Sequence, residues 1–274
     1  MKEIIKTIVG SILIIILPKK AKQLSNKGMT IVVDLTLKER LMRHALLGKA
    51  KKNEDFETLS QFHQDFWTNK GEEYFSGQFN DHVLEYFFIP KCLFLFTLMQ
   101  KELQEDFEKC NMIVEIGTGD GKVLQYLSNK FPQKNRFIGL DLSSSQIEAN
   151  KKFFDKVDKL EFVAADAFDW IEKNREEHMI IFTSRGVLEY FTQSKLQIFF
   201  YKLNSIGKII FIAIEPTGVN HNYLKNLNSE IYGSENSFSH NYAKLFREAG
   251  FEIWHHSTEK STNEYNMNFI GAKN

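Results

Sequence analysis

Residues 114–124 read VEIGTGDGKVL and place three glycines at alternate positions between an apolar run and a segment with helical spacing. These glycines are Gly117, Gly119 and Gly121. Glycine adopts backbone conformations with positive φ and lets a ligand approach the chain without a Cβ in between. The stretch therefore predicts a strand, a loop pressed against a small molecule, and a helix.

The register of the glycines excludes two common nucleotide-binding loops. A dinucleotide loop has the pattern G-x-G-x-x-G, and the position of its third glycine is occupied here by Lys122. A phosphate-binding P-loop ends in Gly-Lys followed by Ser or Thr, whereas Val123 follows here. The ligand has to be identified from the rest of the chain.

Apolar runs alternate with helical patterns from residue 110 onward. The expected strands are 111–117, 136–143, 160–167, 179–184, 207–216, 251–258 and 264–273. The expected helices are 122–131, 144–154, 166–174, 192–205 and 241–250. Alternating strands and helices predict an α/β fold with a doubly wound, mostly parallel seven-stranded sheet. The last two strands follow each other without a helix, which predicts a closing antiparallel strand.

The glycine loop resembles the first motif of the class I S-adenosylmethionine-dependent methyltransferases, an acidic residue followed by x-G-x-G-x-G. Glu115 is that acidic residue, and Asp141 lies 20 residues after Gly121, at the end of the second expected strand. The family uses an acidic residue there to hold both ribose hydroxyls, which carboxylate oxygens can accept as hydrogen bonds. The resemblance covers roughly residues 110–274 and includes the final antiparallel strands.

The resemblance implies S-adenosyl-L-methionine as the cofactor and a role for each matching residue. Glu115 would bind the methionine amino group, often through water, and Asp166 would lie near the adenine, with Ala167 supplying a backbone donor. The end of the fourth strand, TSRGVLEYF, would meet the methionine moiety and the substrate. The expected cofactor-binding residues are Glu115, Gly117, Thr118, Gly119, Gly121, Asp141, Leu142, Asp166, Ala167 and Ser184.

Some of these residues have a structural alternative. Glu115 could merely orient the glycine loop, Asp141 could be an acid at a helix N-terminus, and Asp166 could cap the next helix. The sequence leaves these alternatives open.

The acceptor is constrained mainly by motifs that are missing. TSRG at 183–186 is not the Asn/Asp-Pro-Pro-aromatic motif of amino-group methylases. Cytosine C5 methylases need a cysteine nucleophile near the fourth or fifth strand, and neither cysteine of this chain lies there. Protein-arginine methylases carry two glutamates after the fourth strand, and only Glu189 is available here. We therefore expect methyl transfer to a small-molecule, sugar or lipid-linked acceptor, at oxygen. An aminopropyl-transferase-like enzyme and a non-catalytic module that keeps the fold are the alternatives.

Transfer to a hydroxyl is helped by a general base. The candidates near the expected strand ends are Glu189, Tyr190, Glu215, His221 and His240, and we take Glu189 and His221 as the candidate catalytic residues. The alternative for His221 and His240 is that they are exposed loop histidines. Nothing in the sequence predicts a metal site.

Three regions are expected along the chain: an apolar segment at 1–22, a helical cap at 23–109 and the cofactor-binding domain at 110–274. Residues 7–17 carry no charge, and Pro18 and three lysines follow. The run is shorter than the roughly 20 residues of a spanning helix. It predicts a membrane-surface or marginally spanning anchor, a segment packed on the protein, or an export signal or misassigned start. In the cap, Phe66, Trp67, Tyr74 and Phe75 are core residues or line the pocket, and 56–90 and 216–242 are expected to wall the acceptor site.

Composition narrows the function classes. Lysine plus arginine and aspartate plus glutamate each number 35, and this balance argues against a dedicated nucleic-acid binder. The two cysteines, Cys92 and Cys110, form no disulfide framework and fit a reducing compartment. We expect a cytoplasmic protein, held at the inner face of the membrane if residues 1–22 are an anchor. The oligomeric state is left open.

Overall fold

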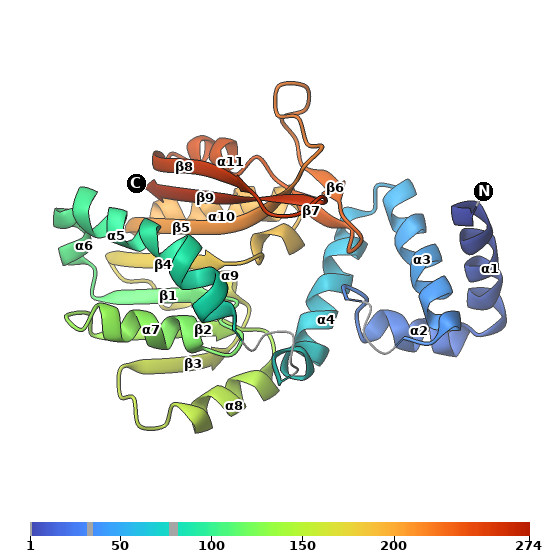
Figure 1. The fold of residues 1–274 in the computed structure, drawn as a ribbon, viewed down its shortest axis with the longest axis horizontal. Helices are drawn as coiled ribbons and strands as arrows, with labels where there is room; N and C mark the ends of the chain where they lie inside the picture. Colours follow the sequence, from blue (N-terminus) through green and yellow to red (C-terminus); the bar gives the residue numbers. More distant parts are fainter. Residues whose placement is uncertain (1, 32–34, 77–81) are drawn as a thin grey trace.

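The computed structural model describes residues 2–31, 35–76 and 82–274, and its centre is a seven-stranded sheet of order β3-β2-β1-β4-β5-β9-β8 (Figure 1). The strands are β1 Met112–Ile116, β2 Arg136–Asp141, β3 Leu160–Ala164, β4 His178–Ser184, β5 Lys208–Gly218, β8 Glu252–Lys260 and β9 Tyr265–Lys273. Strands β1 to β5 pair in parallel, and β9 runs antiparallel to both β5 and β8. The predicted mostly parallel sheet with a closing antiparallel strand is confirmed.

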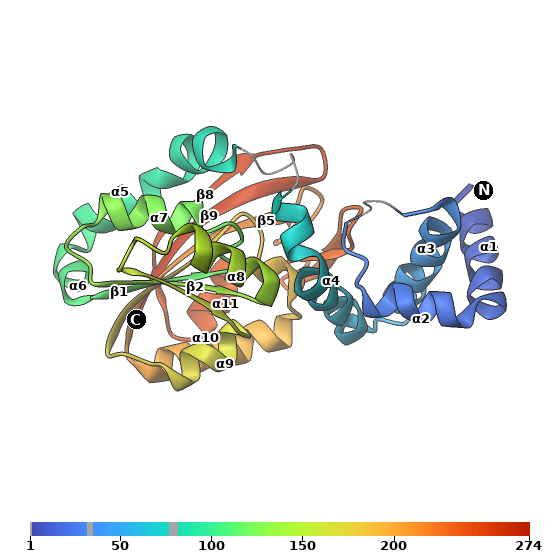
Figure 2. The same ribbon diagram turned by 90° about the horizontal axis from the view of Figure 1, so that it is seen from below.

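Helices cover both faces of the sheet (Figure 2). They include α7 Lys122–Lys130, α8 Ser144–Phe153, α9 Ala167–Lys173, α10 Gln193–Ile206 and α11 Tyr242–Glu248. The buried strands explain the two layers, because successive side chains point to opposite faces. In β1, Val114 joins the core under α9, α10 and α11, whereas Ile113 joins the core under α7 and α8.

The N-terminal part is helical, as predicted. Its elements are α1 Lys2–Ile16, α2 Pro18–Asn26, α3 Leu37–Lys52, α4 Phe56–Ser76, the π-helical segment η2 Leu84–Cys92, α5 Leu93–Glu102 and α6 Gln104–Lys109. Helices α1 to α3 lie beyond α4, on the side away from the sheet (Figures 1 and 2). By contrast, Phe88, Phe96 and Phe107 belong to a core on the sheet. Residues 84–109 therefore pack with the sheet, although the sequence assigned them to the cap.

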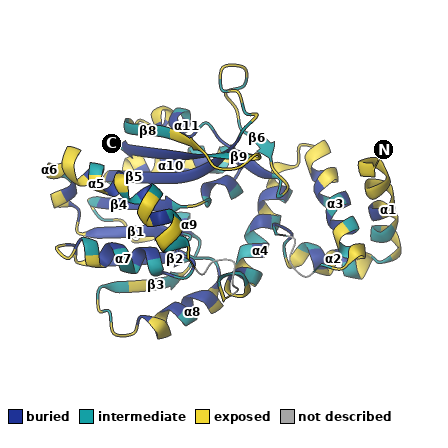
Figure 3. Cartoon of the chain, in the orientation of Figure 1, coloured by how far each residue is buried: buried dark blue, intermediate teal, exposed yellow. Residues whose placement is uncertain are grey.

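Helix α1 packs on α3 through a close backbone approach. A Cβ on Gly10 would lie 2.1 Å from the Leu41 carbonyl oxygen and 2.8 Å from the Cβ of Ala45. The other side of α1 is exposed (Figure 3). Within the described ranges, no helix combines the length and the apolar character needed to cross a bilayer.

Candidate active site

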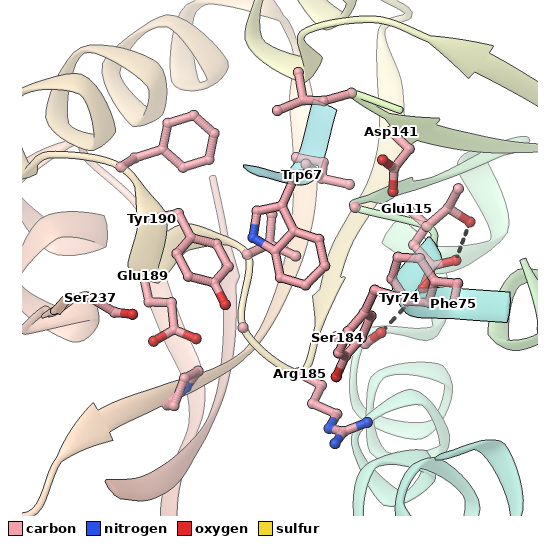
Figure 4. Close-up of a pocket in the computed structure, with 18 of the residues that line it drawn as sticks. Trp67, Tyr74, Phe75, Glu115, Asp141, Ser184, Arg185, Glu189, Tyr190 and Ser237 are labelled. Carbon is pink, nitrogen blue, oxygen red and sulfur yellow. Dashed lines mark hydrogen bonds between the residues drawn. The ribbon is translucent and has the colours of Figure 1, made fainter. Parts of the chain in front are cut away.

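A cavity of about 300 Å³ lies at the carboxyl ends of the central strands and is walled by α4 and a hairpin (Figure 4). The hairpin consists of β6 Glu230–Tyr232 and β7 Ser237–Ser239. Strand order reverses between β1 and β4, and ligands of open α/β sheets bind at such a reversal. The predicted residues that line this cavity are Glu115, Gly117, Thr118, Asp141, Leu142, Asp166, Ala167, Ser184 and Glu189.

The glycine loop adopts the left-handed conformation at all three glycines, with φ of 71° at Gly117, 50° at Gly119 and 73° at Gly121. Gly119 does not itself line the cavity, because a Cβ there would lie 2.6 Å from the ring of Phe75 in α4. Gly121 is likewise covered, with a Cβ position 2.8 Å from the ring of Phe162. The loop thus needs glycine both for its backbone conformation and for the side chains packed on it.

Glu115 is buried at the end of β1 and bridges two elements. One carboxylate oxygen accepts a hydrogen bond from the Thr118 hydroxyl at 2.8 Å, and the other accepts one from the Ser184 hydroxyl at 3.2 Å. Burial raises the pKa of Glu115 to about 8. A cationic group at this position would favour the ionised carboxylate.

This buried acid makes the stability of the ligand-free protein fall with rising pH. Between the usual pKa of 4.5 and the folded value of about 8, the folded state keeps a proton that the unfolded chain has lost. Glu115→Gln cannot ionise, so its free energy of unfolding relative to the wild type should be higher at pH 8 than at pH 5, by more than about 1 kcal/mol. Urea unfolding at both pH values measures this. The same difference in free energy of unfolding between variant and wild type at both pH values would contradict the raised pKa of Glu115.

Asp141 is fixed beside the glycine loop at the end of β2. Its carboxylate accepts hydrogen bonds from the backbone N–H groups of Gly119 and Ser143, each at 3.0 Å. Burial raises its pKa, and these backbone bonds lower it in part. The carboxylate therefore couples the second strand to the loop at the cavity wall.

Asp166 caps α9, which is the structural alternative that the sequence left open. Its side chain accepts from the backbone N–H groups of Phe168 at 2.9 Å and Asp169 at 3.2 Å. Asp166 and Ala167 still line the cavity. The capping role and a place beside a ligand are both compatible with this geometry.

Glu215, one of the candidate bases, holds the loop after β4. Its carboxylate accepts from the backbone N–H groups of Val187 at 3.0 Å and Leu188 at 3.1 Å. Burial raises its pKa to about 7. Glu215 is therefore a positioning residue for the 3₁₀ turn η3, Leu188–Tyr190, which carries Glu189.

Glu189 and Tyr190 face a second acidic residue that sequence reasoning missed. The Tyr232 hydroxyl donates to Glu189, and the Tyr190 hydroxyl donates to Glu235 at 3.2 Å. Tyr232 and Glu235 belong to the hairpin region of 216–242, where no motif marks them. Only the expectation that this segment walls the acceptor site pointed toward them.

The structure does not bring His221 to the cavity. Its Nδ1 pairs with the Ser239 hydroxyl at 2.8 Å and its Nε2 with the Asn226 carbonyl at 3.2 Å, so both ring nitrogens are engaged in the 216–242 segment. His240 also lies away from the cavity, and burial lowers its pKa to about 3. His221 therefore links parts of this segment and does not line the cavity that holds the other predicted residues.

Residues 113–208 match the family described as "Methyltransferase domain". This stretch is similar to methyltransferase domains. It contains the glycine loop, Asp141 and the turn with Glu189, and the resemblance to class I S-adenosylmethionine-dependent methyltransferases is confirmed. The sequence has no significant match among curated proteins.

Two solved structures have a similar fold. The first is the magnesium protoporphyrin IX methyltransferase of Synechocystis, solved with bound SAM, at 13% identity and a TM-score of 0.52, covering 78% of this chain and 96% of that one. The second is a SAM-dependent methyltransferase of Leishmania major, at 13% identity and a TM-score of 0.50, covering 76% and 84%. Similarity at this level of identity shows a shared fold alone.

Proposed function

We propose that the protein transfers a methyl group from S-adenosylmethionine to a small-molecule acceptor. The observation that carries this proposal is the convergence of the left-handed glycine loop, Asp141 and Glu115 on one cavity. Asp141 would hold the ribose, Glu115 the methionine ammonium, and Asp166 with Ala167 the adenine. Buried carboxylates with raised pKa suit a ligand that carries positive charge.

When bound, the cofactor supplies a methyl group on a cationic sulfur, which is already an activated electrophile. The residues of this chain would bind, orient and shield it. Trp67 and Phe75 of α4 lie against the cavity and would limit the access of water. Glu189, buried and lining the cavity, is the group that we propose takes a proton from the acceptor. Oxygen in a small molecule, sugar or lipid-linked glycan is the acceptor expected from the sequence.

Calorimetric titration of the full chain with S-adenosylmethionine, S-adenosylhomocysteine, decarboxylated S-adenosylmethionine and NAD tests the cofactor. We expect micromolar binding of the first two and none of NAD. A preference for the decarboxylated compound would favour aminopropyl transfer. Absence of binding by all three sulfur compounds would overturn the proposal, and binding without any turnover on an acceptor panel would favour a non-catalytic module.

We also propose that α1 lies on a membrane surface at the cytoplasmic face. Its exposed large apolar residues are Ile4, Ile5, Ile8, Val9, Ile12, Ile15 and Ile16. At 100° per residue they fall within an arc of roughly 140°, opposite the side on which Gly10 meets α3. Lysines lie at positions 2 and 6 of α1 itself and at positions 19, 20 and 22 of the following helix α2. An apolar face with flanking lysines suits the interface of an anionic membrane.

Flotation with vesicles of phosphatidylglycerol and phosphatidylcholine measures this binding. The double variant Ile8→Asp/Ile15→Asp should lower the bound fraction at least tenfold, because both side chains lie in the exposed arc. The control, Leu224→Asp/Leu227→Asp, changes two exposed apolar residues elsewhere and should bind like the wild type. Equal loss in both variants, or no binding by the wild type, would contradict a membrane role for α1.

A further inference from the structure

The cavity has two parts with different chemistry (Figure 4). On one side of Trp67 lie Glu115 and Asp141, where the cofactor is proposed to bind. On the other side lie Glu189 and Tyr190, with Ser237 nearby. The second part is formed by the η3 turn and the β6–β7 hairpin, and none of the residues proposed to hold the cofactor lies on these elements.

The second part carries two carboxylates in a poorly hydrated setting. Glu189 is only 7% exposed, and burial together with the charges of Glu235 and Glu215 raises its pKa well above the usual value. Burial raises the pKa of Glu235 as well, and the hydrogen bond from Tyr190 and the charge of Arg43 lower it in part. The Arg43 guanidinium is itself engaged by the carbonyl oxygens of Met29, Thr30 and Ser234. A cation between the two glutamates would therefore favour their ionised forms, which burial alone disfavours.

Aromatic rings form the rest of this wall. The Trp67 ring centre lies 5.7 Å from that of Tyr190, 5.3 Å from that of Tyr74 and 6.0 Å from that of Phe75. Within the described residues, the indole N–H of Trp67 is buried and has no hydrogen-bond partner. Aromatic faces attract ammonium groups, and this attraction is stronger where water is excluded.

We propose that the acceptor is a cationic amine, held between Glu189 and Glu235 and packed on Trp67 and Tyr190. The proposal rests on the proposed function and replaces its oxygen acceptor by nitrogen. The ammonium first gives a proton to the ionised Glu189 carboxylate, which exposes the nitrogen lone pair, and the proton passes from Glu189 to water. The lone pair then forms the new N–C bond, while the C–S bond breaks with its electron pair left on sulfur.

An isosteric pair of probes tests the charge of the acceptor. Benzylamine and benzyl alcohol differ at the functional group and share the ring that would pack on Trp67. Their binding is titrated at neutral pH with and without S-adenosylhomocysteine. We expect the wild type to bind benzylamine at least tenfold more tightly than benzyl alcohol. The variant Glu189→Gln/Glu235→Gln should lose this preference while keeping its affinity for S-adenosylhomocysteine.

A control variant at an exposed acid shows whether the effect belongs to this site. Glu252→Gln removes an exposed acid on β8 and should behave like the wild type. Equal or weaker binding of the amine in the wild type, binding of neither probe, or a preference that survives the double substitution would overturn the proposal. A wild-type protein that does not bind S-adenosylhomocysteine would instead count against the proposed function. The comparison of the two probes without cofactor would then still test the charge of the acceptor.

Discussion

Asp141→Ala is expected to weaken S-adenosylmethionine binding by roughly 30- to 150-fold, which corresponds to about 2–3 kcal/mol. Two effects add. The variant loses the carboxylate proposed to hold the ribose hydroxyls, and it also frees the backbone N–H groups of Gly119 and Ser143 that the carboxylate now engages. Calorimetric titration measures the loss.

The control for Asp141→Ala is Asp158→Ala, which removes an exposed aspartate from the loop before β3. It should leave the affinity unchanged. Thermal unfolding of both variants shows whether the fold is kept. An Asp141→Ala protein that binds the cofactor like the wild type would refute the ribose assignment, whatever its stability.

Gly119→Val is expected to lower cofactor affinity at least ~100-fold. At φ of 50° a side chain with a Cβ is strained by about 1–2 kcal/mol, and a branched one by more. The new Cβ would also overlap the Phe75 ring at 2.6 Å, so either the loop or α4 must move from the cavity wall. The binding curve and the midpoint of thermal unfolding are measured together.

Gly48→Val is the matched control because the same substitution meets no atom within 4 Å on the exposed side of α3. It should bind the cofactor normally and unfold at or slightly above the wild-type temperature, since valine suits a helix better than glycine. Normal affinity in folded Gly119→Val would mean that the glycine loop is not the binding loop.

The sheet could be predicted from the sequence because its signals are local. Apolar runs of strand length alternate with helical patterns, and the glycines of 117–121 mark the loop after the first strand. In a parallel sheet the ends of successive strands meet at one edge, so Glu115, Asp141 and Ser184 were expected to lie together. The structure places all three on one cavity.

The direction of the His221 ring could not be predicted from the sequence. His221 follows β5 closely enough to reach the cavity, but the chain turns so that its ring meets Ser239 and Asn226. The direction of a loop side chain depends on the packing of the whole 216–242 segment. Position along the chain therefore identified the 216–242 segment as a wall of the cavity, but not which of its side chains point into the cavity.

By itself, the sequence determined the α/β sheet, the left-handed glycine loop and the acidic residues that follow the first two strands, because each depends on neighbours within one strand–loop–helix unit. The tertiary structure alone decided what faces them. The pairs Tyr232–Glu189 and Tyr190–Glu235 join residues 43 and 45 positions apart, and Trp67 reaches the same cavity from α4. Contacts between residues so far apart in the sequence produce no periodic pattern in it, since only the packing of the hairpin and α4 on the sheet creates them.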